Sequence, residues 1–232
     1  MTSFVFETLK MLIPPLPWQR LRHRPGDGDR VVLLHGLWRS VWAMEIPARR
    51  LHQAGFETLN LPYSSFRKPL PDLVDDVAAA LPPSQKVTHF VTHSMGGILV
   101  RCLARRHPGL VTGKVIMMAP PNQGSEIVDW LADSPLARWS LGPGGMQLST
   151  RFVREKIPDF PPGQEVEVIM GRRAVFPVFS FLLPGENDGI VTVEGGRMPG
   201  VRRFAVRDVD HTLMMGREEV LELLREWLLS TE

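Results

Sequence analysis

The sequence predicts an α/β protein: a mostly parallel central sheet of about six strands, flanked by helices. Short, continuous apolar runs such as residues 31–34 are typical of central parallel strands, which are buried on both faces. Segments with helical spacing of apolar residues separate these runs, and parallel strands need such crossovers. The 232 residues suit one domain with a substantial core.

Strands and helices are expected to alternate along the first half of the chain. Residues 1–29 hold no convincing strand, because prolines and a glycine-rich turn cluster interrupt them. A strand at residues 31–34 precedes a helix at 41–54. A second strand at residues 56–60 precedes a helix at 71–81.

The alternation continues in the second half. A β-branched and aromatic strand at residues 87–92 leads into a helix that stops near residue 106, before a Pro-Gly pair. The next strand covers residues 113–119. Residues 125–163 have no strand signal, and their apolar residues recur at roughly helical spacing, which indicates a small helical cap. The remaining elements are strands at 165–170 and 201–206 and a terminal helix at 218–229.

One very sharp turn joins the strand that ends near residue 92 to the helix that follows it. It has the sequence Thr-His-Ser-Met-Gly-Gly, residues 92–97. Such a turn needs small residues two positions before and after the serine, because the strand and helix backbones nearly touch. The turn exposes the hydroxyl of Ser94, and the start of the helix offers N–H groups to a developing oxyanion. Ser94 is therefore the candidate nucleophile; the other Ser-x-Gly, at Ser140, has no strand before it.

This turn resembles the nucleophile elbow of the α/β-hydrolase fold, G-x-S-x-G, with Thr92 where the family usually has its first glycine. The segment His-Gly-Leu-Trp at residues 35–38 resembles the His-Gly pair that lipases and esterases of this fold carry after an early strand. The resemblance implies an oxyanion hole made by the backbone N–H groups of Leu37 and Met95. The side chain of His35 is expected to be structural and bonded to its own loop.

The resemblance also implies the other two members of a triad. Asp188 follows the penultimate strand in Asp-Gly-Ile-Val, and His211 lies in the loop before the last helix, where the family places its acid and its base. The chain order Ser94, Asp188, His211 is that of α/β hydrolases. Loops at the carboxyl ends of parallel strands gather along one edge of the sheet, so the three residues can meet. The competing acids are Glu186, Asp208 and Asp210.

The expected function is hydrolysis of carboxylic esters with apolar acyl groups, because residues 30–230 resemble small bacterial lipases and esterases. Ser94 would form the acyl-enzyme, His211 would transfer the proton, and Asp188 would orient the imidazole. An acyltransferase or a thioesterase would use the same triad, and the β-branched Thr92 favours a third alternative, a catalytically silent binding protein of this fold. Apolar residues of the predicted cap motivate the apolar acyl group: Trp130, Leu131, Leu136 and Trp139.

Composition argues against several other functions. The net charge is only +2, and the basic clusters lack the interleaved aromatic residues of nucleic-acid binding surfaces, so no nucleic acid partner is expected. The 7 histidines lack metal-ligand spacing, and the glycine-rich loops lack the context for phosphate binding, so neither a metal nor a cofactor is expected. The one cysteine, Cys102, is expected to be a buried, inert thiol.

The chain is expected to consist of an N-terminal extension at 1–29 and an α/β-hydrolase domain at 30–232 that includes the cap region 125–163. No apolar run is long enough to span a membrane, and no secretory signal is recognised, so a cytoplasmic enzyme is expected. Peripheral membrane contact through the N-terminal segment is an alternative to packing against the domain. The residues concerned are Phe4, Phe6, Leu9, Met11, Leu12 and Ile13.

Overall fold

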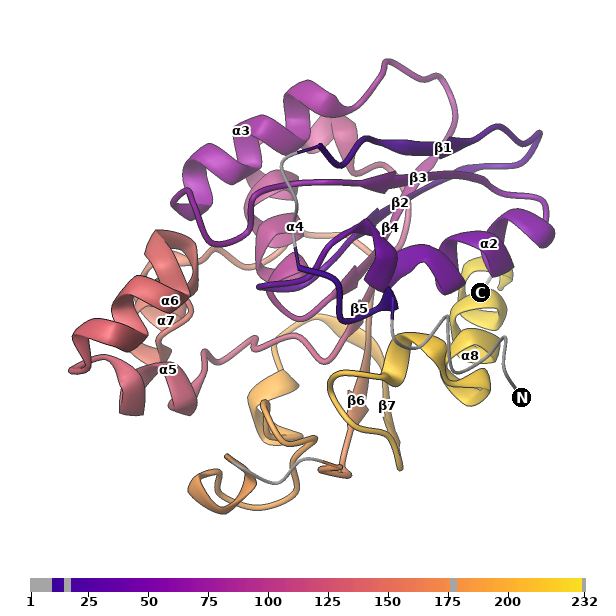
Figure 1. Ribbon diagram of the computed structural model, residues 1–232. Coiled ribbons are helices and arrows are strands. Elements are labelled where there is room, and N and C mark those ends of the chain that lie inside the picture. Colours follow the sequence, from indigo (N-terminus) through magenta and orange to yellow (C-terminus); the bar gives the residue numbers. More distant parts are fainter. Residues whose placement is uncertain (1–9, 15–17, 176–178, 231–232) are drawn as a thin grey trace.

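A twisted seven-stranded sheet forms the centre of the computed structural model, which describes residues 10–14, 18–175 and 179–230. The strand order is β1-β3-β2-β4-β5-β6-β7, and every neighbouring pair is parallel except β1 and β3. Helices α3 and α4 cover one face of the sheet, and helices α2 and α8 cover the other (Figure 1). The molecule is therefore a three-layer α/β structure.

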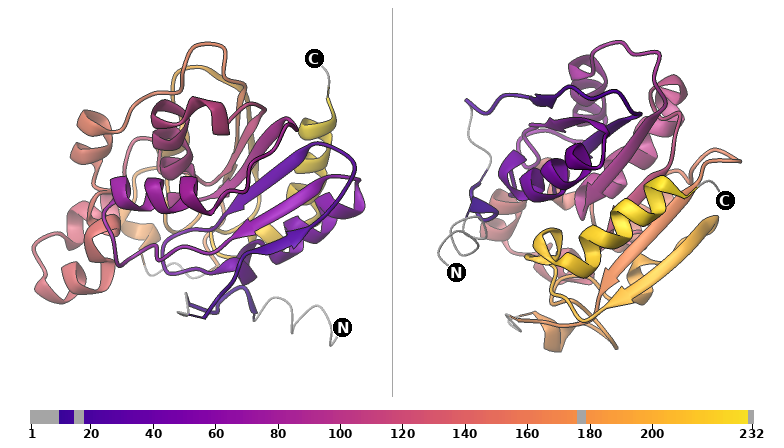
Figure 2. Two further views of the ribbon diagram at one scale, coloured as in Figure 1. Left: turned by 90° about the horizontal axis from the view of Figure 1, so that it is seen from above. Right: turned by 90° about the vertical axis from the view of Figure 1, so that its right-hand side faces the viewer.

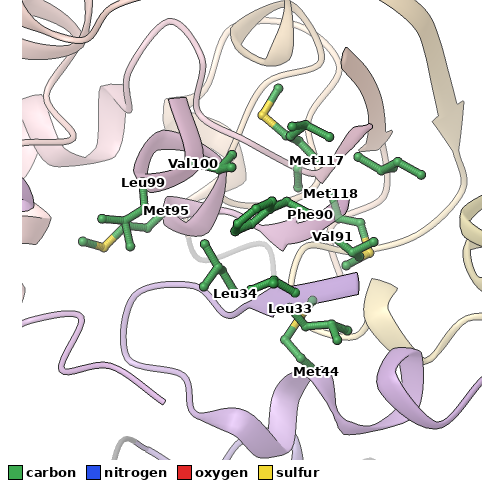
Figure 3. Close-up of a cluster of buried hydrophobic side chains, with 14 of the residues drawn as sticks. Leu33, Leu34, Met44, Phe90, Val91, Met95, Leu99, Val100, Met117 and Met118 are labelled. Carbon is green, nitrogen blue, oxygen red and sulfur yellow. The ribbon is translucent and has the colours of Figure 1, made fainter. Parts of the chain in front are cut away.

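The six strands predicted from the apolar runs are all present. Every residue of β2 to β6 is buried, which is why these strands appear in the sequence as continuous apolar runs rather than as alternating patterns. Figure 3 shows side chains of β2, β4 and β5 packed together in the core. The bounds are β2 (Arg30–Leu34), β3 (Glu57–Leu61), β4 (Thr88–His93), β5 (Val115–Met118), β6 (Val166–Gly171) and β7 (Val201–Arg207).

The helices predicted around the sheet are also present. The predicted helix at 41–54 is divided into a 3-10 turn, η1 (Val41–Met44), and α2 (Glu45–Gln53). Pro47 lies in the first turn of α2, where a missing N–H removes no intrahelical bond. The other scaffold helices are α3 (Leu70–Ala80), α4 (Met95–Arg106) and α8 (Glu218–Leu229), and short 3-10 turns are η2 (Pro108–Leu110), η3 (Ser180–Leu182), η4 (Glu194–Gly196) and η5 (Met214–Gly216).

The expectation that residues 1–29 hold no strand is wrong, because β1 (Arg22–Arg24) pairs antiparallel with β3. Its sequence is Arg-His-Arg, and charged contacts hold it in place. Arg22 and Arg24 both pair with Glu45, and the Arg22 guanidinium lies 3.6 Å from the ring centroid of Trp42. No apolar pattern marks such a strand, so the sheet has seven strands rather than about six.

The N-terminal apolar residues are only partly within the described structure. Phe4, Phe6 and Leu9 lie outside the described residues. Met11 is buried in the core, and the carbonyl of Ile13 accepts a hydrogen bond of 2.8 Å from the Ser40 hydroxyl. These two residues therefore pack against the domain.

The region between β5 and β6 folds into three helices, as the apolar spacing predicted. They are α5 (Glu126–Leu131), α6 (Pro135–Met146) and α7 (Thr150–Lys156), and they stand out at one side of the molecule (Figure 1, Figure 2). Each begins at a serine whose hydroxyl accepts a backbone N–H of the first turn. The serines are Ser125, Ser134 and Ser149.

Arg101 on α4 anchors both ends of this helical region. Its buried guanidinium donates hydrogen bonds to the carbonyl of Asn122, at 3.0 Å, and to the carbonyl of Pro158, at 3.1 Å. The chain leaves β5 near the first residue and returns towards β6 near the second. The cap is thus attached to the same helix that begins at Ser94.

Among the helices of the described residues, none has both the length and the apolar character that crossing a lipid bilayer requires.

A buried carboxylate, Glu57 on β3, connects the strands on one side of the sheet. It lies 2.9 Å from Arg30 of β2, 2.9 Å from His23 of β1 and 3.1 Å from the ammonium of Lys86. Burial alone would raise the pKa of Glu57, but hydrogen bonds from Arg30, Lys86 and His23, together with the positive charge of Arg30, outweigh it and hold the pKa below its ordinary value. The ionised carboxylate therefore contributes to stability.

We predict that Glu57→Gln lowers the free energy of unfolding at pH 7 by about 3–5 kcal/mol, because the buried Arg30 loses its counter-charge. Since the pKa of Glu57 is lowered by folding, its contribution is complete above the ordinary glutamate pKa of about 4.3. It is lost as the pH falls through the folded-state pKa, so the two proteins should approach equal stability below that range. Urea unfolding at a series of pH values measures the difference.

The control is Glu155→Gln, which removes an exposed carboxylate 3.1 Å from Arg151. An exposed pair of this kind contributes at most about 1 kcal/mol. Equal losses in the two variants would show that the Glu57 contacts do not act as a buried ion-pair network.

Candidate active site

The turn between β4 and α4 holds Ser94 in a strained backbone conformation. Its φ of 52° and ψ of −121° are uncommon for a residue other than glycine, and such strain is concentrated at functional sites. The amide of Ser94 donates a hydrogen bond of 2.8 Å to the carbonyl of Met118 on β5, which fixes the turn to the sheet. The predicted elbow is therefore present, although the buried Thr92 occupies the position of its first small residue.

The imidazole of His211 lies between Ser94 and Asp188. Its Nε2 is 3.1 Å from Oγ of Ser94, and its Nδ1 is 2.8 Å from Oδ2 of Asp188. The other oxygen of Asp188 accepts the N–H groups of Ile190, at 3.0 Å, and Val191, at 2.7 Å. This carboxylate is fully hydrogen-bonded, so Nδ1 is the nitrogen that carries the proton, and Nε2 is free to accept one from serine.

The competing acids occupy other positions. Asp208 and Glu186 are exposed and lie beside the guanidinium of Arg172, at 2.6 Å and 3.8 Å. Asp210 is buried, but its Oδ1 accepts two backbone N–H groups of the turn that follows it, each at 3.0 Å. The acid that hydrogen-bonds the imidazole of His211 is Asp188, in the Asp-Gly-Ile-Val segment.

His93, which the sequence motif did not mark as functional, holds the backbone of His211. Its Nε2 lies 2.9 Å from the carbonyl oxygen of His211, and the centroids of the His93 and His211 rings are 4.8 Å apart. Complete burial, followed by the charges of His211 and Arg39, lowers the pKa of His93 well below its ordinary value. His93 is therefore neutral and donates through Nε2. Its only sequence signal is its position next to Ser94.

The loop after β2 packs directly against the nucleophile. A Cβ atom on Gly36 would lie only 3.1 Å from Cβ of Ser94 and 3.0 Å from Nδ1 of His93, so glycine gives the loop backbone its close approach without displacing either neighbour. In the described part of the chain, no hydrogen bond uses the backbone N–H of Leu37 or of Met95. Both groups therefore remain available as hydrogen-bond donors.

The side chain of His35 serves its own loop. Its Nδ1 lies 2.9 Å from the carbonyl oxygen of Gly36, and its ring stacks on Tyr63 with the centroids 4.1 Å apart. Burial lowers the pKa of His35 to about 4, so the ring is neutral near pH 7. His35 thus shapes the loop that presents Leu37.

The cap touches the site through α6. A Cβ on Gly144 would lie 3.0 Å from Cε of Met95, and one on Gly145 would lie 3.0 Å from Cδ2 of Leu37. Three of the apolar cap residues that motivated an apolar acyl group point instead to solvent, since Trp130, Leu136 and Trp139 are 62%, 73% and 78% exposed. The glycine-rich end of α6 is therefore the part of the region between β5 and β6 that contacts Leu37 and Met95.

Among the described residues, no group of three or more His, Cys, Asp or Glu side chains is arranged to hold a metal ion.

Comparison with known proteins supports this interpretation of the fold. A family model described as the alpha/beta hydrolase family matches residues 31–223. The mature form of the Bacillus licheniformis lipase BlEst2 is similar at a TM-score of 0.75 and 19% identity, over 90% of this chain and 98% of that chain. The metagenomic carboxyl esterase MGS0156 is similar at a TM-score of 0.63 and 21% identity, over 79% of this chain and 64% of that chain.

A third solved structure, the esterase EaEST from Exiguobacterium antarcticum, has a TM-score of 0.57 and 18% identity, over 90% of this chain and 95% of that chain. No sequence among curated proteins matches this chain. At these identities the structural neighbours establish the fold alone.

We predict that Gly96→Ala lowers the free energy of unfolding by about 1–3 kcal/mol, as overpacking does, even though alanine favours helix. The new Cβ would lie 2.7 Å from the carbonyl oxygen of Leu34 and 2.9 Å from that of His35, so α4 would have to move away from β2. Gly109→Ala is the matched control, because its Cβ would meet nothing within 4 Å. Chemical denaturation of the two variants tests this; equal stabilities would contradict the close approach.

Proposed function

The chain belongs to the α/β hydrolase family, and we propose that it is a serine hydrolase that cleaves carboxylic esters with apolar acyl groups. The observation that carries this proposal is the buried chain of hydrogen bonds from Ser94 through His211 to Asp188, with distances of 3.1 Å and 2.8 Å. The esterase and lipase names of its structural neighbours agree with it.

Acylation begins with the Ser94 hydroxyl, which is a weak nucleophile until its proton is removed. As Oγ attacks the ester carbonyl carbon, Nε2 of His211 takes the proton, and the carbonyl oxygen becomes negatively charged. The N–H groups of Leu37 and Met95 stabilise that oxygen, and one such donor typically contributes about 3–4 kcal/mol. The C–O bond to the alcohol then breaks, and His211 gives its proton to the leaving oxygen.

Deacylation repeats these steps with water as the nucleophile. His211 takes a proton from water as its oxygen attacks the acyl carbon, and then returns a proton to Oγ of Ser94 when the acid leaves. Asp188 remains ionised throughout and stabilises the imidazolium that forms in each half-reaction. The neutral His93 keeps the backbone of His211 in place without adding a second positive charge.

The apolar acyl group is proposed from the surroundings of the oxyanion donors. The side chains of Leu37 and Met95 are apolar, and the glycine-rich end of α6 lies against both. We therefore propose that the cap region 125–163 covers the substrate within the domain 30–232. An acyl chain entering between cap and scaffold would meet mostly apolar atoms.

We predict that a fluorophosphonate forms a single covalent adduct, on Ser94, and that Ser94→Ala forms none. The reagent reports an activated serine, because the adduct forms only when a base accepts the hydroxyl proton. Intact-mass measurement and peptide mapping identify the adduct. Heat-denatured wild type should lose the reaction. A native, folded wild type without any adduct would contradict the proposal and favour a catalytically silent binding protein.

Fluorophosphonate labelling also tests the proposed role of Asp188. Asp188→Asn should slow labelling by at least about a thousandfold, because the amide stabilises the wrong tautomer of His211. Asp208→Asn is the matched control, since its carboxylate is exposed and paired with Arg172, and it should label at the wild-type rate. Equal slowing of labelling by both substitutions would show that Asp188 does not orient His211 as proposed.

We further predict that kcat/KM for p-nitrophenyl esters rises from acetyl to octanoyl, because each buried CH₂ contributes up to about 0.8 kcal/mol of binding free energy. Hydrolysis rates across the series give the chain-length preference. A preference for acetyl would contradict the apolar part of the proposal. Added alcohols and amines as acceptors, followed by product analysis, distinguish hydrolysis from acyl transfer.

A further inference from the structure

A cavity of about 270 Å³ lies between α3, α4 and α7. Its walls are apolar side chains of these helices and of the residue after α7, together with the thiol-bearing Cys102. The apolar residues are Leu70, Pro71, Val74, Phe152 and Ile157. Cys102 follows Ser94 by eight residues, or roughly 12 Å of helix at 1.5 Å per residue. No member of the triad lines this cavity, so it is separate from the nucleophile.

Two cationic side chains complete the lining, Arg106 from α4 and Lys156 from α7. Both are exposed, and Arg106 also pairs with Asp75 at 2.9 Å. Within the described residues, the ammonium of Lys156 forms no ion pair, so it adds an uncompensated positive charge. The cavity therefore combines an apolar interior with a positively charged mouth.

We propose that this cavity binds a medium-chain carboxylic acid, with its chain against the apolar walls and its carboxylate beside Lys156 and Arg106. The two parts of such a ligand match the two parts of the cavity, since the apolar chain leaves water and the carboxylate stays near cations at the surface. A neutral alcohol of the same length lacks the carboxylate that would lie beside the two cations. A short acid lacks the long chain that would pack against the apolar walls.

The position of the cavity gives the bound acid a structural effect. Leu70 and Val74 belong to the scaffold, and Phe152 and Ile157 belong to the cap region. A hydrogen bond of 2.6 Å from the amide of Leu70 to the side chain of Gln147 already joins the same two parts. An acid in the cavity adds contacts to both and so stabilises the attachment of the cap.

That the bound acid is a reaction product rests on the proposed function, because hydrolysis of esters with apolar acyl groups releases acids of this class. Binding itself does not depend on catalysis. The readout below uses no substrate, so its failure is distinguishable from failure of the proposed hydrolysis.

Cys102 supplies that readout, because it is the one cysteine of the chain and lies in the cavity wall. It is half-buried rather than fully buried, contrary to the sequence expectation, so part of the residue is exposed to solvent. Burial raises the pKa of its thiol to about 11, which keeps it largely protonated and slow to react near pH 7. Labelling with N-ethylmaleimide at pH 8.5 should therefore be slow enough to follow by intact mass.

Decanoate, kept below its micellar concentration, is the probe for the full-length protein. It should slow labelling of Cys102 at least fivefold at saturation, whereas butyrate and decan-1-ol at the same concentration should slow it less than twofold. Lys156→Gln should raise the decanoate concentration for half-protection at least fivefold. Arg154→Gln, which removes an exposed cation of α7 outside the cavity lining, should leave it unchanged.

Three results would overturn the proposal. Absence of protection by decanoate would show that the cavity does not take the acid. Equal protection by decan-1-ol would show an apolar site without recognition of the carboxylate. Equal effects of Lys156→Gln and Arg154→Gln would show a general charge effect. If decanoate protects Cys102 but Ser94 forms no fluorophosphonate adduct, the acid-binding site would be supported. A product of ester hydrolysis would then be excluded as its natural ligand.

Discussion

The candidate site depends on how closely the first turn of α4 approaches the end of β2. A Cβ on Gly96 would lie 2.7 Å and 2.9 Å from the carbonyl oxygens of Leu34 and His35, and a Cβ on Gly36 would lie 3.1 Å from Cβ of Ser94. The same turn holds Ser94 at a strained φ of 52°, and the parallel sheet on either side supports it. A looser approach would separate the N–H groups of Leu37 and Met95, the proposed oxyanion donors, from Ser94.

Around this contact lie the hydrogen-bonded carboxylate of Asp188 and two buried histidines whose pKa values are lowered. Asp188 receives two backbone N–H groups and the imidazole of His211, so its ionised form is well solvated by the protein. His93 and His35 lie close by, but burial lowers the pKa of both, and they remain neutral. The imidazolium that forms on His211 during the proposed reaction therefore meets one counter-charge and no neighbouring histidine cation.

Much of this arrangement could be predicted from the sequence, because central parallel strands are buried on both faces and leave continuous apolar runs. The triad residues follow such strands, so their order and position carried the prediction of Ser94, Asp188 and His211. The strand β1 could not be found this way, since ion pairs rather than apolar burial hold it. The contact of His93 with His211 could not be predicted either, because it joins residues far apart in the sequence. The exposure of the cap tryptophans was also not predicted, since periodicity indicates which residues share a helical face but not what that face contacts.

The same helix α4 links the candidate site to the cavity beside Cys102. Its first turn packs closely against the end of β2 at Gly96. α7 lines the cavity, while the end of α6 touches Leu37 and Met95, and Gln147 between them bonds α3. A ligand stabilises one arrangement of a protein only by binding it more tightly than the alternatives. The proposed acid would contact both cap and scaffold, so its binding would favour the arrangement in which the two are attached, whereas an acid held by the scaffold alone would not.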